Sequence, residues 1–114
     1  MLTHAKSWIT VSSKMDIEFH DKNLALIETD RAGETKLPLA VVNSARRKLV
    51  VIRAAPDERT LRNWKSLRYE KLTGDRQGQR SIRINEKWRM VFKLDDSCSP
   101  AKIVVFAIEN HYGD

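Results

Sequence analysis

The fold is decided by the stretch from Gly74 to Phe92, which reads GDRQGQRSIRINEKWRMVF. Polar and apolar residues alternate over 79–84 and less cleanly over 88–92, with Asn85-Glu86-Lys87 between them, which predicts two antiparallel strands joined by a turn. One face of this hairpin can be buried while the other presents cations to a phosphate. The basic residues of the stretch are Arg76, Arg80, Arg83, Lys87 and Arg89.

Positive charge is concentrated around this hairpin. The 114 residues include 21 Lys and Arg against 15 Asp and Glu, a formal net charge of +6, and 41% are hydrophobic. Segment 38–89 holds 14 of the basic and 5 of the acidic residues. A chain of this size can bury one modest core, so we expect one domain. The cationic block favours a polyanionic partner such as RNA or DNA over a merely solvated, Arg-rich surface.

The remaining composition indicates a soluble cytoplasmic protein. Its single cysteine, Cys98, cannot form an internal disulfide, and it has no adjacent basic or histidine residue that would activate a catalytic thiol. The longest apolar run, 103–108, is too short to span a membrane, and residues 1–15 lack the apolar core of a signal peptide. We expect residues 1–14 to be an N-terminal extension or a poorly packed arm, and 15–114 to form the domain.

The order of the predicted elements indicates an α+β fold. A short strand is expected at 16–19, a short helix at 22–30, and a clear amphipathic helix between Pro38 and Pro56, where apolar residues recur every three or four positions. A last strand is expected at 102–110, whose near-continuous apolar sequence predicts burial on both faces. We predict two N-terminal helices packed on a largely antiparallel C-terminal sheet of three to four strands.

Several conspicuous side chains have a structural interpretation. Trp64 and Trp88 are expected to pack in the core rather than to stack on bases. Arg46, Arg47 and Arg53 lie opposite the apolar stripe of the main helix, where a solvated face is the default.

Nothing in the sequence supports a metal site or a nucleotide cofactor. His4, His20 and His111 are scattered, paired cysteines are absent, and the Gly74-x-x-x-Gly78 turn lacks the Lys-Ser/Thr of a P-loop. We therefore expect no metal and no cofactor. RNA can be cut without a metal when its own 2′-hydroxyl attacks the adjacent phosphate, which needs a base, an acid and cations.

The chain contains each of these groups. His111 and Tyr112 are candidate proton carriers, although a His-Tyr pair at a chain end also fits a frayed tail. Glu70 is a carboxylate in a basic neighbourhood. The candidate phosphate-binding cations are Arg68, Lys71, Arg76, Arg80, Arg83 and Arg89.

Three short motifs and the end of the chain carry a resemblance to a known family. Leu72-Thr73-Gly74 begins the glycine turn, Ser81-Ile82-Arg83-Ile84 forms the first strand, and Trp88-Arg89 begins the second. This pattern closely resembles the HigB branch of the RelE-like toxins, over approximately residues 16–112. In those toxins an acidic residue, Asp, Tyr and His form the active site at the end of the last strand. The equivalent here is Glu109-Asn110-His111-Tyr112.

The resemblance implies a RelE-like fold and an active site that includes Asn110, His111, Tyr112, Glu70 and Arg89. Asn110 stands where many members have Asp, and the order His111-Tyr112 is reversed. Glu70 stands where some members have His and others a carboxylate. The acid and the base are therefore not assigned.

Two functional hypotheses follow. The first, implied by the family, is a metal-independent endoribonuclease toxin of a type II toxin–antitoxin system. Such a toxin cuts mRNA in the ribosomal A site, leaves a 2′,3′-cyclic phosphate and a 5′-hydroxyl, and is bound by a small HigA-like helix-turn-helix antitoxin. The alternative is a catalytically inactive RelE-fold protein that binds nucleic acid or an antitoxin, in which Asn110 and the exchanged terminus mark lost chemistry. Catalytic turnover of RNA distinguishes the two hypotheses, because only the first requires it.

Overall fold

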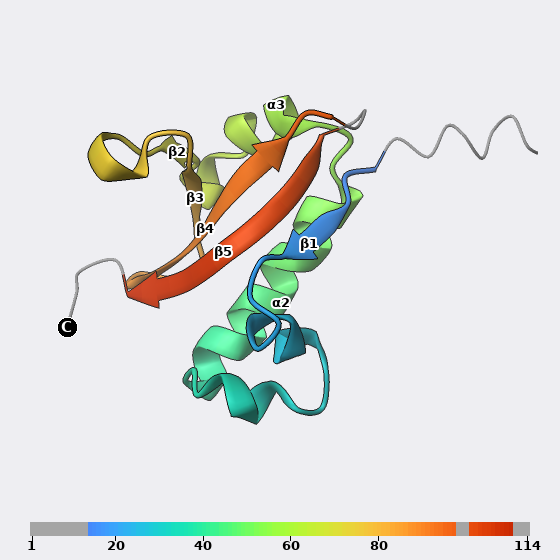
Figure 1. The fold of residues 1–114 in the computed structure, drawn as a ribbon, viewed down its shortest axis with the longest axis vertical. Helices are drawn as coiled ribbons and strands as arrows, with labels where there is room; N and C mark the ends of the chain where they lie inside the picture. Colours follow the sequence, from blue (N-terminus) through green and yellow to red (C-terminus); the bar gives the residue numbers. More distant parts are fainter. Residues whose placement is uncertain (1–13, 98–100, 111–114) are drawn as a thin grey trace, which may run out of the picture.

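Strands dominate the second half of the chain, as the alternating sequence predicts (Figure 1). The computed structural model describes residues 14–97 and 101–110. The helical elements are the 3-10 turn η1 (Leu24–Glu28), the 3-10 turn η2 (Ala32–Thr35), α2 (Leu39–Ala54), α3 (Glu58–Asn63), and the 3-10 turns η3 (Lys65–Leu67) and η4 (Gly74–Arg76). The strands are β1 (Ile17–Phe19), β2 (Glu70–Lys71), β3 (Arg80–Arg83), β4 (Trp88–Asp95) and β5 (Lys102–Asn110).

The predicted hairpin is confirmed as β3 and β4, which pair antiparallel. The turn between them is held by the Asn85 side chain. Its Oδ1 accepts hydrogen bonds from the backbone N–H groups of Lys87 and Trp88, at 2.9 and 3.0 Å. Asparagine suits this position because its short side chain reaches the backbone two residues further on.

In the described residues the sheet has five strands in the order β1-β5-β4-β3-β2, which is more than the predicted three to four. β1 runs parallel to β5, and the other three pairings are antiparallel, so the sheet is mixed but largely antiparallel. The strand that the sequence did not reveal is β2, because its two residues are too few for an alternating pattern. β1 can join in parallel because the helical segments carry the chain across between the two strands.

The main helix α2 lies where the sequence predicts it, directly after Pro38 and ending at Ala54. Pro56 follows and cannot continue the helix. Asp57 then caps the short helix α3, because its Oδ1 accepts the backbone N–H of Thr60 at 2.9 Å.

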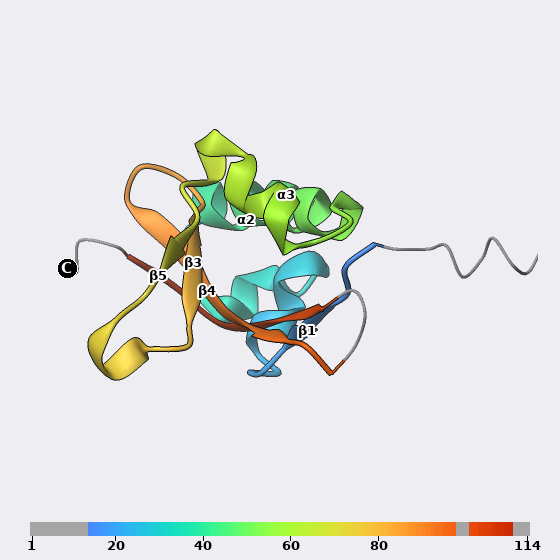
Figure 2. The ribbon, with the colours of Figure 1, turned by 90° about the horizontal axis from the view of Figure 1, so that it is seen from above.

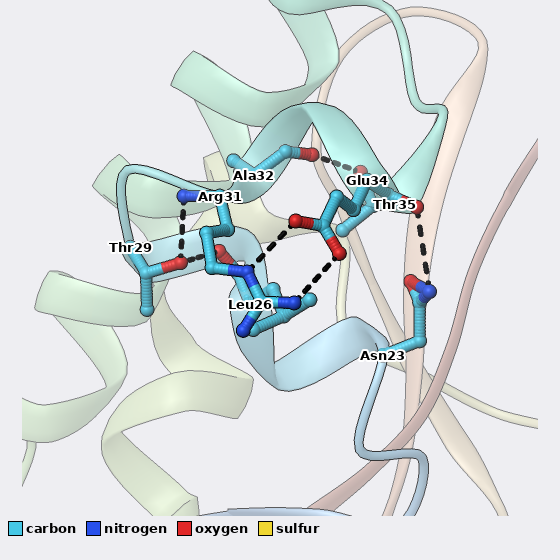
Figure 3. A network of polar contacts seen from close by, with 7 residues as sticks. All are labelled: Asn23, Leu26, Thr29, Arg31, Ala32, Glu34 and Thr35. Carbon is cyan, nitrogen blue, oxygen red and sulfur yellow. Dashed lines mark hydrogen bonds and ion pairs between the residues drawn. The ribbon is translucent and has the colours of Figure 1, made fainter.

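The predicted α-helix at 22–30 is wrong, since this segment forms only the 3-10 turn η1. The Thr29 hydroxyl donates to the Leu26 carbonyl at 2.7 Å and accepts the backbone N–H of Arg31 at 3.0 Å (Figure 3). Thr35 acts in the same way at the end of η2, donating to the carbonyl three residues earlier. Both threonine hydroxyls hydrogen-bond to nearby backbone groups and so compete with the hydrogen bonds of an α-helix. The segment therefore forms two short turns.

Arginines of α2 hold η1 in place, which corrects the expectation that they form a solvated face. Arg46 donates from Nε and Nη2 to carbonyls at the end of η1, at 2.7 and 2.8 Å. Arg53 pairs with Glu28, with Nη2 and Oε1 at 2.7 Å. Of the three arginines, Arg47 is the exposed one.

The core lies between the sheet and the helices α2 and α3, which cover one of its faces (Figure 2). Leu49 and Ile52 of α2 are fully buried together with Ile82, Met90 and Phe92 of the hairpin. Within the described residues no α-helix covers the opposite face of β3, β4 and β5, which leaves that face available for a site.

Two predictions about burial are wrong. Trp64 is 45% exposed and is not a core residue. In β5, Ile103 and Val105 are buried in the core, whereas Phe106 is half-buried and stacks on His20 with ring centroids 4.4 Å apart. β5 is therefore buried mainly on one face, because no α-helix in the described part of the chain covers the other.

Candidate active site

Charged side chains from four adjacent strands lie on the sheet face that α2 does not cover. Alternate residues of β3 enter the core, so Arg83 points to the other face, as predicted. Arg83 lies opposite Arg89 of β4, which lies opposite Glu109 of β5. Glu70 of β2 lies opposite Ser81, which shares the face of Arg83. Paired residues point to the same face, so the topology brings these charged side chains together.

A cleft of about 410 Å³ opens on this face. Arg68 enters it from the end of η3, where the chain turns in the left-handed region with φ 50° and the Arg68 N–H bonds to the Lys65 carbonyl. Trp88 is also part of the lining, and its side chain packs half-buried against the core, as predicted. Four predicted site residues line this cleft, namely Arg68, Glu70, Arg83 and Arg89. Glu86, which was not predicted, is also a charged residue of its lining.

Glu109 holds two of the predicted cations. Arg89 donates from Nε and Nη2 to one oxygen of Glu109, at 3.0 and 2.8 Å. Arg76 donates to both oxygens, at 2.7 and 2.9 Å. The hydrogen bonds from Arg76, with those from Arg89, lower the pKa of Glu109 to about 2 despite partial desolvation. Arg76 reaches β5 because its loop turns tightly at Gly74 and Gly78, with φ 66° and 95°.

Glu109 belongs to the terminal motif Glu109-Asn110-His111-Tyr112 but was not among the predicted site residues, although a carboxylate near the end of an apolar strand is a usable signal. Glu109 holds the Arg89 guanidinium in one orientation. Two nitrogens of the guanidinium are fixed, while Nη1 makes no hydrogen bond within residues 14–97 and 101–110. This group can therefore donate to a ligand in the cleft from a fixed position.

Two other predicted phosphate ligands, Arg80 and Lys71, lie on the opposite face of the sheet as register partners. Arg80 donates from Nε to Glu58 of α3 at 3.1 Å, and the Tyr69 hydroxyl donates to the same carboxylate. Burial, followed by the hydrogen bond to Glu58, raises the pKa of Tyr69. This cluster ties α3 to the sheet and does not line the cleft.

The end of β5 lies beside the start of β4. Asn110 is opposite Trp88, so its side chain points away from the face of Glu109. His111 and Tyr112, the predicted proton carriers, lie outside the described residues, as does Cys98.

In the described part of the chain, no three His, Cys, Asp or Glu side chains are grouped so that they could hold a metal ion. No helix in this part is long and apolar enough to cross a membrane. What the cleft offers is arginine donors, which match the oxygens of a phosphate, and the Glu70 carboxylate, which can accept a proton.

The mixed sheet with one main helix on one face is a fold that solved structures share. The YoeB/ParE toxin from Agrobacterium tumefaciens superposes with a TM-score of 0.52, covering 86% of this chain and 100% of that one at 19% identity. Residues 17–107 match the family described as "RelE-like toxin of type II toxin-antitoxin system HigB". The chain therefore belongs to the HigB-like toxins, which confirms the resemblance found in the sequence.

Similarity to individual proteins supports this assignment. Toxin HigB-1 of Vibrio cholerae serotype O1 is 35% identical over 82 residues, which cover 72% of this chain and 86% of that protein. YafQ from E. coli strain BL21(DE3) shares the fold with a TM-score of 0.50 and 16% identity, over 87% of this chain and 96% of that one. The structure of a YoeB-YefM complex from Staphylococcus aureus matches with a TM-score of 0.50 and 19% identity, over 87% and 99%.

Proposed function

We propose that this HigB-like toxin is an endoribonuclease that cleaves mRNA on the ribosome and thereby inhibits translation and growth. The observation that carries the proposal is the meeting of Glu70 with Arg68, Arg83 and Arg89 at one cleft. Three cations suit a phosphodiester, and a carboxylate among them suits proton transfer. The division into an extension at 1–14 and a toxin domain at 15–114 stays a prediction.

The proposed reaction uses the RNA as its own nucleophile. The ribose 2′-oxygen bonds to the adjacent phosphorus, and the bond from phosphorus to the 5′-oxygen breaks. A base takes the 2′-hydroxyl proton and an acid protonates the departing 5′-oxygen, which gives a 2′,3′-cyclic phosphate and a 5′-hydroxyl. Glu70, His111 and Tyr112 are the candidates for these two roles. Arg89 is the candidate that stabilises the charge on the five-coordinate phosphorus, through the Nη1 that makes no hydrogen bond to the described residues.

The proposal includes a ribosome and an antitoxin as partners. A toxin with weak proton-transfer groups gains rate when the ribosome holds the messenger in a reactive geometry. The antitoxin is a HigA-like helix-turn-helix protein, and the Staphylococcus aureus complex of YoeB with YefM supports an antitoxin partner. Because the substrate lies on ribosomes, the place of action is the cytoplasm.

Single-turnover cleavage of ribosome-bound messenger tests the proposal. His111→Ala and Tyr112→Phe should each slow cleavage by about a hundredfold to ten-thousandfold while ribosome binding changes little. The matched control is Arg47→Ala, on the exposed side of α2, which should cleave at the wild-type rate. Wild-type rates from both terminal variants would instead favour the inactive binding protein.

A further inference from the structure

A second hollow, of about 920 Å³, continues the cleft around the turn of the hairpin. The two hollows share the wall residues Arg68, Arg83, Asn85 and Glu86. Because the same side chains line both, one surface groove runs from the proposed reaction site, past the β3–β4 turn, towards α2 and η3.

The new part of the groove is cationic. Lys48 of α2 and Lys65 of η3 line it together with Arg68 and Arg83, and among the described lining residues Glu86 has the one carboxylate. These four cations come from four separate places in the chain: α2, η3, the turn that follows η3, and β3. The groove is therefore a product of the fold and not one charged helix face.

The charges of this groove are not neutralised internally. Within residues 14–97 and 101–110, none of its four cations has a carboxylate oxygen within 4.0 Å. Three of the arginines predicted to bind phosphate differ, since Arg76 and Arg89 are paired with Glu109 and Arg80 with Glu58. Arg83 donates its Nε to the Asn85 carbonyl at 3.2 Å, which holds its guanidinium at the junction of the two hollows.

We propose that this groove, through Lys48 and Lys65, binds the phosphate backbone of the messenger strand that enters or leaves the cleft. The inference rests on the proposed endoribonuclease function and adds the path of the substrate. An extended groove with several unpaired cations fits a run of phosphates better than a single small anion. Trp64, which directly precedes Lys65 and is 45% exposed, supplies an aromatic surface of the kind on which unpaired bases stack.

Binding of uncleavable single-stranded RNA tests the groove separately from the chemistry. The probes are a trinucleotide and a decanucleotide in which 2′-methoxy groups replace the 2′-hydroxyls, and titrations followed by NMR give both affinities. The variant Lys48→Gln/Lys65→Gln is compared with Lys14→Gln/Lys22→Gln, which removes two exposed lysines away from both hollows.

Loss of two phosphate contacts should flatten the dependence of log affinity on log salt by about 1.4 for the decanucleotide. If the variant and the wild type bind the decanucleotide equally at 1 M salt, this change in slope makes the variant bind about 25-fold more weakly than the wild type at 0.1 M salt. The trinucleotide, which is the short probe for the cleft, should bind both variants like the wild type. The control pair should leave both affinities unchanged.

Three outcomes would overturn the groove as an RNA path. The first is that the lysine variant binds the decanucleotide as tightly as the wild type. The second is that its affinity falls equally for both RNA lengths. The third is that only its affinity for the antitoxin falls, which would make the groove a protein-binding surface. Failure of the endoribonuclease proposal is distinguishable, because it would appear as absent cleavage of ribosome-bound messenger by the wild type.

Discussion

Replacing Glu109 by Gln should destabilise the folded protein, because it removes the carboxylate that binds both Arg76 and Arg89. The pKa of Glu109 is lowered from 4.5 to about 2, which sets an upper limit of about 3 kcal/mol on its contribution at neutral pH. The side chains of Arg76 and Glu109 remain 37% and 29% exposed, so solvent screening should reduce the loss to about 1–2 kcal/mol.

The same contribution should depend on pH in a defined direction. Well above pH 4.5, Glu109 is ionised in both the folded and the unfolded chain, and its full stabilisation is present. As the pH falls from about 5 to about 2, the unfolded chain takes up its proton first, so the stabilisation is lost. The difference in unfolding free energy between wild type and Glu109→Gln should therefore shrink towards zero across this interval.

Urea unfolding followed by circular dichroism at pH 7, 5, 4 and 3 measures this difference. The matched control is Glu34→Gln, which removes a carboxylate that also forms two hydrogen bonds with an arginine but lies on the exposed surface. It should change stability much less. A Glu109→Gln difference that stays constant from pH 7 to pH 3 would refute the assigned role of the Arg76–Glu109–Arg89 cluster.

Three further predictions concern function and folding. Arg89→Ala should slow cleavage by about a hundredfold or more, and Arg89→Lys should restore little, because a lysine cannot bind Glu109 and a phosphate in a fixed planar geometry; single-turnover rates measure both. Tyr69→Phe should lower the unfolding free energy by about 1 kcal/mol through its lost bond to Glu58, as urea unfolding would show. Induction of the chain in bacteria should arrest growth, and co-expression of a helix-turn-helix antitoxin from the same operon should restore it; normal growth with verified soluble toxin would argue against toxicity.

The structure explains which sequence-based predictions were wrong. The segment at 22–30 has helical spacing of apolar residues, yet Thr29 and Thr35 bind their own local backbone and leave only 3-10 turns. Such competition depends on side-chain orientation, which periodicity does not record. Trp64 was expected in the core because aromatic residues usually are, but the short helix α3 ends just before it and leaves it on the surface.

The hairpin, the main helix, the cationic middle of the chain and the family could be predicted from the sequence, because alternation, helical spacing and short motifs are local properties. Which positive charges are available to a ligand depends on the tertiary structure. Arg76, Arg80 and Arg89 look equivalent in the sequence, yet each is bound by a carboxylate between 20 and 33 positions away. Lys48 and Lys65 attract no notice in the sequence but line an open groove. The physical reason is that pairing depends on distance in space, which strand register and helix packing set.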